Sequence, residues 1–123
     1  MLKTAVVGLG WWGRQIVTSL QGSEEISVTD GVDVDMESAA PFAAEKNIRL
    51  GPSYDHVLAD AGIDAVILAT PHGLHETQVM QAASAGKQIF CEKPLALSAA
   101  AAERMLAACD AAGITLGIGH ERR

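Results

Sequence analysis

The sequence is short of aromatic residues, cysteines and basic side chains, and each shortage excludes a class of protein. Aromatic residues fill 4 % of its 123 positions, and two cysteines, Cys91 and Cys109, are too few for a disulfide framework, so we expect buried thiols. Nine lysines and arginines stand against fifteen acidic residues, and the net charge of −6 offers no footprint for nucleic acid. No apolar run approaches the length of a membrane span, so we expect no membrane partner.

The N-terminal residues enter a strand pattern at once, without the charged and apolar regions of a secretory signal, so we expect a cytoplasmic protein. Apolar residues make up 49 % of the chain, and many of them are alanines, which favour helices. A chain of this length can build one domain with a hydrophobic core, but not two. We therefore expect residues 1–123 to form a single domain.

Short apolar runs alternate with longer, alanine-rich stretches along the chain. The runs predict strands at Leu2–Val7, Ile26–Val34, Ile48–Leu50, Ala65–Ala69, Lys87–Cys91 and Ile114–Ile118. The stretches predict helices at Trp11–Leu20, Glu37–Lys46, Tyr54–Leu58, His75–Ala85 and from the N-cap Ser98 through Ala112. This alternation is typical of βαβ units, so we predict an α/β fold with a doubly wound parallel sheet of about six strands and helices on both faces.

Four residues bear on where these helices begin and end. Ser53 is expected to cap the short helix after it, and Gly86 and Gly113 are expected to end the helices before them. Pro41 lies within the second predicted helix, where a residue without an N–H is expected only in the first turn.

The six residues between the first strand and the first helix, Gly8-Leu9-Gly10-Trp11-Trp12-Gly13, match the pattern G-x-G-x-x-G. In this context the first glycine allows a tight turn, the second lets the backbone approach a pyrophosphate, and the third lets helix and strand pack closely. The helix N-terminus adds free N–H groups and the positive end of its dipole. The motif predicts a Rossmann-type dinucleotide site. Two placements stay open for Trp11 and Trp12, either over the pyrophosphate or facing the substrate, or packed under the loop as core.

The same fingerprint requires an acidic residue about 20 positions further on, which binds the ribose hydroxyls. Asp33 lies at that distance from Gly13, close to the end of the second strand, and is our candidate. Asp30 falls inside the strand, where it needs a partner of its own, and Asp35 is placed to cap the next helix. Val34 follows Asp33 where an arginine or serine could receive a 2′-phosphate, which favours NAD over NADP as cofactor.

Two further segments accompany the glycine motif, Ala69-Thr70-Pro71-His72-Gly73-Leu74-His75 after the fourth strand and Phe90-Cys91-Glu92-Lys93-Pro94-Leu95 after the fifth. Together the three segments resemble the N-terminal domain of the Gfo/Idh/MocA oxidoreductases, the family of glucose–fructose oxidoreductase and inositol dehydrogenase. The resemblance covers the whole chain, and Glu92-Lys93-Pro94 is its most specific element. It implies an NAD-dependent dehydrogenase that passes hydride between the nicotinamide and a hydroxyl or ketone carbon of a sugar, cyclitol or related compound.

The resemblance also implies roles for single residues. Lys93 is implied to lie near the reacting hydroxyl, where an ammonium can stabilise developing alkoxide charge, and Glu92 to hold the nicotinamide ribose. The nicotinamide half of the groove is implied to be lined by Thr70, Pro71 and His72. For His75, at the start of a helix, a cofactor-binding role and a structural role stay open. His72 and His75 have no third potential metal ligand nearby in the sequence, so we predict no metal site.

Members of this family continue into a second α/β domain, which supplies most of the substrate pocket, the proton-transfer residues and the usual oligomer interface. We therefore expect a small polyol or sugar substrate, a homo-oligomer in the full-length protein, and exposed apolar surface on this chain where the second domain packs. The chain is either a fragment of such a protein or a stand-alone domain. The alternatives are a non-catalytic NAD-binding sensor or regulatory module, which does not need Lys93, and an unrelated enzyme on the same fold.

Overall fold

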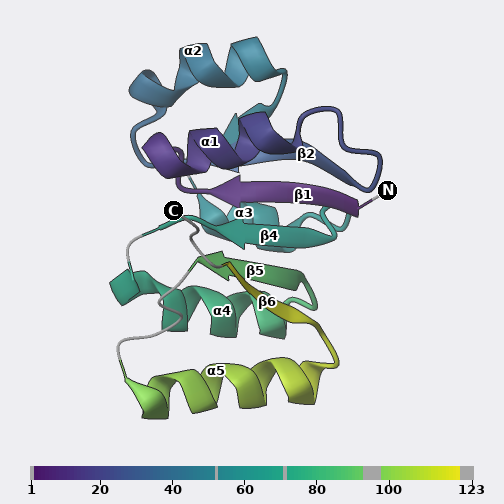
Figure 1. Ribbon diagram of the computed structural model, residues 1–123, viewed down its shortest axis with the longest axis vertical. Helices are drawn as coiled ribbons and strands as arrows, with labels where there is room; N and C mark the ends of the chain where they lie inside the picture. Colours follow the sequence, from purple (N-terminus) through teal and green to yellow (C-terminus); the bar gives the residue numbers. More distant parts are fainter. Residues whose placement is uncertain (1, 52, 71, 93–97, 120–123) are drawn as a thin grey trace.

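The computed structural model describes residues 2–51, 53–70, 72–92 and 98–119 (Figure 1). Six parallel strands form one sheet in the order β3-β2-β1-β4-β5-β6. The strands are β1 (Leu2–Val7), β2 (Ile26–Val32), β3 (Arg49–Gly51), β4 (Ala65–Leu68), β5 (Gln88–Glu92) and β6 (Leu116–Gly119). The helices are α1 (Trp11–Leu20), α2 (Met36–Lys46), α3 (Tyr54–Ala59), α4 (His75–Ser84) and α5 (Ala99–Ala112), with a 3₁₀ turn η1 (His72–Leu74). The strand order reverses between β1 and β4, which confirms the predicted doubly wound sheet.

Hydrophobic side chains pack on both faces of this sheet. Val66 and Leu68 of β4 belong to the core cluster that α3, α4 and α5 cover, and Ile67 between them belongs to the cluster that α1 and α2 cover. Since successive side chains of a strand point to opposite faces, β4 is buried on both, as its wholly apolar run predicted. Cys91 and Cys109 lie in the first cluster, which confirms the expected buried thiols.

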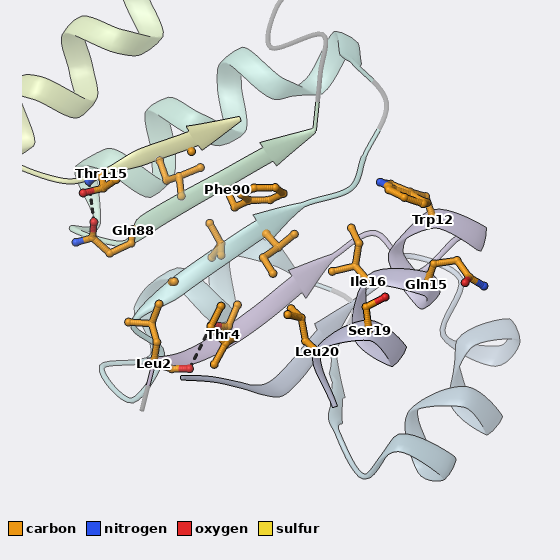
Figure 2. Close-up of a pocket in the computed structure, with 16 residues that line it drawn as sticks. Leu2, Thr4, Trp12, Gln15, Ile16, Ser19, Leu20, Gln88, Phe90 and Thr115 are labelled. Carbon is orange, nitrogen blue, oxygen red and sulfur yellow. Dashed lines mark hydrogen bonds between the residues drawn. The ribbon is translucent and has the colours of Figure 1, made fainter. Parts of the chain in front are cut away.

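One half of the sheet has an open face. On the side of α1, no helix within the described ranges covers β5 and β6, and a groove of about 780 Å³ lies there, between these strands and α1. Figure 2 shows Ile16 and Leu20 of α1 turned toward this groove, with Phe90 of β5 across from them. Phe90 is 39 % exposed, which is high for a phenylalanine inside a parallel sheet. The structure therefore contains the exposed apolar surface expected from the sequence.

Every predicted strand and helix boundary agrees with the structure to within two residues. β2 ends at Val32 rather than Val34, because the carboxylate of Asp33 accepts backbone hydrogen bonds from Leu9 and Asp35 and the chain turns there. At Ser53 the predicted N-cap position is confirmed, although its side chain makes no capping hydrogen bond. Gly86 and Gly113 both adopt positive φ just after α4 and α5, as expected of residues that end helices.

Pro41 is the residue for which the prediction is wrong. It lies at the sixth position of α2, beyond the first turn, and the helix continues through it to Lys46. The proline offers no N–H to the carbonyl of Glu37, four residues earlier. Both residues are on the exposed side of α2, so water can satisfy that carbonyl.

None of the helices in the described part of the chain has the length and apolar character that crossing a membrane requires.

Candidate dinucleotide site

The glycine loop connects β1 to α1 at the carboxyl edge of the sheet. Gly8 has φ +96°, a conformation that L side chains rarely adopt, and a Cβ placed there would lie 2.9 Å from the carbonyl oxygen of Ala69. A Cβ on Gly13 would lie only 1.8 Å from the carbonyl oxygen of Gly8. The first glycine therefore permits the turn and the third permits close packing of helix on strand, as predicted. Gly10 differs, because a Cβ there would have no neighbour within 4 Å among the described residues beyond those next to it in the chain.

We expect replacement of Gly13 by alanine to destabilise the domain, because the added methyl group can be accommodated only if α1 moves away from β1. The expected loss is about 1–3 kcal/mol of unfolding free energy, the usual range for an overpacked position. Urea denaturation followed by circular dichroism measures it. Gly10→Ala adds the same methyl group to open space and is the matched control; equal stability of the two variants would contradict this packing.

The N-terminus of α1 has no cap. Its N-cap residue is Gly10, no side chain of the described residues makes a capping hydrogen bond there, and no acidic residue lies in the first turn. The first N–H within the helix that donates to the loop is that of Arg14, which bonds the Gly10 carbonyl at 3.0 Å. The N–H groups ahead of Arg14, with the positive end of the helix dipole, suit an anionic group such as a pyrophosphate.

Asp33 lies directly beside this loop. One carboxylate oxygen accepts the N–H of Leu9 at 2.8 Å, and the other accepts the N–H of Asp35 at 2.8 Å. A carboxylate has about four lone-pair positions, so both oxygens keep capacity for further donors such as ribose hydroxyls. The other two aspartates considered for this role make the contacts expected of them. Asp30 is paired with Arg49 at 2.9 Å within the sheet, and Asp35 caps α2 by accepting the N–H of Ser38 at 3.1 Å.

A pocket of about 440 Å³ opens between this carboxylate and the first turn of α1, lined by Leu9, Gly10, Trp11, Arg14, Asp33, Asp35 and Ser38. The sequence pattern does not identify Arg14 or Ser38 as part of it. The guanidinium of Arg14 donates to the carbonyl of Leu9 at 2.8 Å and to that of Ser38 at 3.2 Å, and it lies 5.4 Å from the ring centre of Phe42. The positively charged side chain of Arg14 is therefore fixed in the pocket of Asp33. The one available signal is that Arg14 directly follows the last glycine of the motif.

The side chains of Trp11 and Trp12 lie in different surroundings. Trp11 is 72 % exposed and lines the pocket of Asp33, whereas Trp12 is partly buried and lines the apolar groove (Figure 2). Their rings stack with centres 5.8 Å apart. Within the described part of the chain, the buried indole nitrogen of Trp12 has no hydrogen-bond partner. Trp11 thus lies on the solvent side of the loop and not beneath it.

The loop after β4 lies against the glycine loop. Val7 of β1 pairs with Leu68 of β4, so the residues that follow, Gly8 and Ala69, leave the sheet side by side. A Cβ on Gly8 would also lie 3.1 Å from a side-chain carbon of Thr70, which confirms how tightly the two loops meet. Leu68 pairs in turn with Cys91, so the end of β5 at Glu92 reaches the same edge. The carboxyl ends of the three adjacent strands β1, β4 and β5, which the predicted segments follow in the sequence, therefore meet at one edge of the sheet.

His75 points inward from the first position of α4. The residue is 1 % exposed, and Nε2 of its ring donates to the carbonyl of Thr70 at 2.8 Å. The structure thus shows a loop-holding contact for this histidine, and a direct cofactor contact stays a prediction. Among the other predicted residues, Pro71 and Lys93 lie outside the described residues, as do the side chains of His72 and Glu92.

Residues 2–120 match the model of a known family, the Gfo/Idh/MocA oxidoreductase family, NAD-binding Rossmann fold. The chain is 36 % identical over 126 residues to scyllo-inositol 2-dehydrogenase (NAD(+)) of Bacillus subtilis, covering 99 % of this chain and 36 % of that protein. It is 34 % identical to 2,7-anhydro-N-acetylneuraminate hydratase of Escherichia coli, with 98 % and 32 % covered. It is also 34 % identical to D-xylose 1-dehydrogenase (NADP(+)) of Haloarcula marismortui, with 97 % and 34 % covered.

The fold is shared with a crystal structure of GenD2 from gentamicin A biosynthesis in complex with NAD. The TM-score is 0.91 and the identity 32 %, over 96 % of this chain and 34 % of that one. The chain spans about a third of the length of the curated relatives it matches. The family match across residues 2–120 shows that the chain belongs to the Gfo/Idh/MocA oxidoreductases, as their NAD-binding Rossmann domain.

Proposed function

We propose that this domain holds NAD while the complete protein transfers hydride between the nicotinamide and a hydroxyl-bearing carbon of a sugar, cyclitol or related compound. The observation that most supports this is the uncapped N-terminus of α1 beside Asp33. The N–H groups of α1 would bind the pyrophosphate, with Gly10 leaving room for it, and Asp33 would accept the ribose hydroxyls. When bound, the nicotinamide supplies the site that accepts or returns the hydride.

The segments after β4 and β5 would form the nicotinamide side of the site. Thr70, Pro71 and His72 would line it, and Glu92 would hold the adjoining ribose. Lys93 would stabilise the negative charge that develops on the substrate oxygen. The support is backbone placement, because β4 and β5 end at the same edge of the sheet as the glycine loop.

The substrate class rests on the relatives, whose names include an inositol dehydrogenase, a xylose dehydrogenase and a hydratase that acts on an anhydro-sugar. We propose a sugar or cyclitol as substrate, in a cytoplasmic homo-oligomer whose further domain packs over the apolar groove of Figure 2. The groove supports that packing because strands of a parallel sheet are normally covered on both faces.

The finer choice of cofactor depends on two opposite charges in one pocket. The carboxylate of Asp33 favours the two free hydroxyls of NAD and repels the 2′-phosphate of NADP. The guanidinium of Arg14, beside the hydroxyl of Ser38, would attract that phosphate. Asp33 stands at the end of β2, where the fingerprint places the ribose contact, so we propose that it decides the preference and that NAD binds more tightly.

Calorimetry with NAD and NADP tests both the proposed dinucleotide binding and the proposed preference for NAD. We expect NAD to bind about tenfold more tightly, a difference of about 1.4 kcal/mol. Asp33→Ala should reduce this difference by raising the affinity for NADP, because Arg14 and Ser38 remain in place. Asp35→Ser keeps a cap on α2 while removing the second carboxylate of the pocket, and should narrow the difference in affinity less than Asp33→Ala does. Equal or tighter NADP binding by the natural sequence would refute the preference, and binding of neither would refute the function.

A further inference from the structure

Thr70, the second residue after β4, is held at two points by one helix. Its hydroxyl donates to the side-chain oxygen of Gln78 at 2.5 Å, and its carbonyl accepts the Nε2–H of His75 at 2.8 Å. His75 and Gln78 are three residues apart in α4, so they lie on the same side of the helix. Main chain and side chain of Thr70 are thus fixed independently.

The helix that makes these contacts is itself held from α3. The hydroxyl of Tyr54 donates to the backbone carbonyl of Gln78 at 2.7 Å. Burial raises the pKa of Tyr54 well above its usual value, so this phenol stays protonated and keeps its donor role. Tyr54 also packs against the core cluster beneath α4. The contacts of Thr70 therefore lead back to the rigid interior of the domain.

The other side of Thr70 faces the dinucleotide site. Its side chain and the carbonyl of Ala69 are the atoms that a Cβ on Gly8 would strike, at 3.1 and 2.9 Å. A shift of the loop after β4 would therefore change the distance between Thr70 and the glycine loop. The pocket of Asp33 and Arg14 is lined by α1, α2 and the end of β2, and none of its lining residues contacts His75 or Gln78 through the hydrogen bonds above.

We propose that His75 and Gln78 are positioning residues, which set the nicotinamide half of the cofactor groove through Thr70 and leave the adenosine half unaffected. This inference rests on the proposed function, because it takes the loop of Thr70 to be the nicotinamide side. It assigns His75 an indirect role: the buried ring orients a backbone carbonyl and does not touch the cofactor.

The test compares the two ends of bound NAD in one experiment. Saturation-transfer NMR on the 123-residue chain measures the signal of the nicotinamide protons relative to that of the adenine protons. Gln78→Leu removes the acceptor of the Thr70 hydroxyl and should lower this ratio several-fold, whereas Gln78→Glu keeps an acceptor oxygen and should restore it. His75→Leu should lower the ratio as well. In a Thr70→Val background, Gln78→Leu should have no further effect, because the hydroxyl it served is gone.

Calorimetry with ADP-ribose, which lacks the nicotinamide, separates positioning from loss of fold. The affinity for ADP-ribose should be the same in the natural sequence and in Gln78→Leu. An unchanged ratio in Gln78→Leu, a natural-sequence domain without nicotinamide signal, or a parallel loss of ADP-ribose affinity would each overturn the inference. Failure of the natural sequence to bind either ligand would instead overturn the proposed function. Because Gln78 is only partly buried, its variants keep the test decisive if His75→Leu does not fold.

Discussion

Valine at position 10 should abolish NAD binding in a domain that remains folded. The backbone of Gly10 has φ −75° and ψ −166°, which an L residue adopts without strain, and apart from its two chain neighbours no described residue has an atom within 4 Å of the position of its Cβ. The isopropyl group would project over the N-terminus of α1, where a pyrophosphate has to approach the N–H groups. Loss of two hydrogen bonds to a charged group, at about 1.5–3 kcal/mol each, corresponds to a fall in affinity of roughly 100-fold or more.

Two measurements on the same protein check this expectation. Calorimetry gives the NAD affinity, and the urea midpoint by circular dichroism shows that the variant is folded. Gly10→Ala presents a smaller obstacle at the same place and should bind NAD with intermediate affinity. A folded Gly10→Val protein with the affinity of the natural sequence would show that the pyrophosphate binds elsewhere.

The second large effect is that the 123-residue chain by itself should oxidise no sugar or cyclitol. It spans about a third of its relatives, and in the proposed site Lys93 supplies only one side of the reacting centre. Orientation of reactants can account for roughly 7–11 kcal/mol of barrier lowering, and a domain without substrate-binding walls supplies little of it. The exposed nicotinamide face would also admit water, which weakens electrostatic stabilisation of an alkoxide.

The measurement is NADH formation by the purified chain with a panel of sugars and cyclitols. We expect no turnover above the background with NAD alone. Clear turnover that disappears in Lys93→Ala would show that the domain is a complete enzyme, and the proposed need for a further domain would be wrong.

Features that depend on residues a few positions apart could be predicted from the sequence. The apolar run of β4 and the glycine ends of α4 and α5 follow from local patterning and backbone conformation. The position of Asp33 beside the glycine loop could be predicted for a similar reason, because strand and helix lengths in a βαβ unit fix its distance along the sequence from that loop. The prediction for Pro41 is wrong because proline is kept out of helix interiors by the loss of one N–H to carbonyl hydrogen bond. On an exposed helix face, water can satisfy the carbonyl instead.

Contacts that depend on how separate elements cross could not be predicted. Arg14 enters the pocket of Asp33 only because α1 passes the start of α2, where the carbonyl of Ser38 receives its guanidinium. The pairing of Thr70 with Gln78 likewise requires the turn η1 between them, which has no clear sequence signal. Both are tertiary consequences of packing helices on a twisted sheet.

The position of Trp11 and Trp12 gives the protein an optical reporter. They are its only tryptophans, and both lie in the first turn of α1. Ultraviolet-excited indole emission therefore comes from one helical turn, with Trp11 in the pocket of Asp33 and Trp12 in the apolar groove. Iodide in solution can reach the 72 % exposed ring of Trp11 more readily than the partly buried ring of Trp12, so quenching divides the emission between them. The fluorescence of the unlabelled protein thus reports the surroundings of a single helical turn.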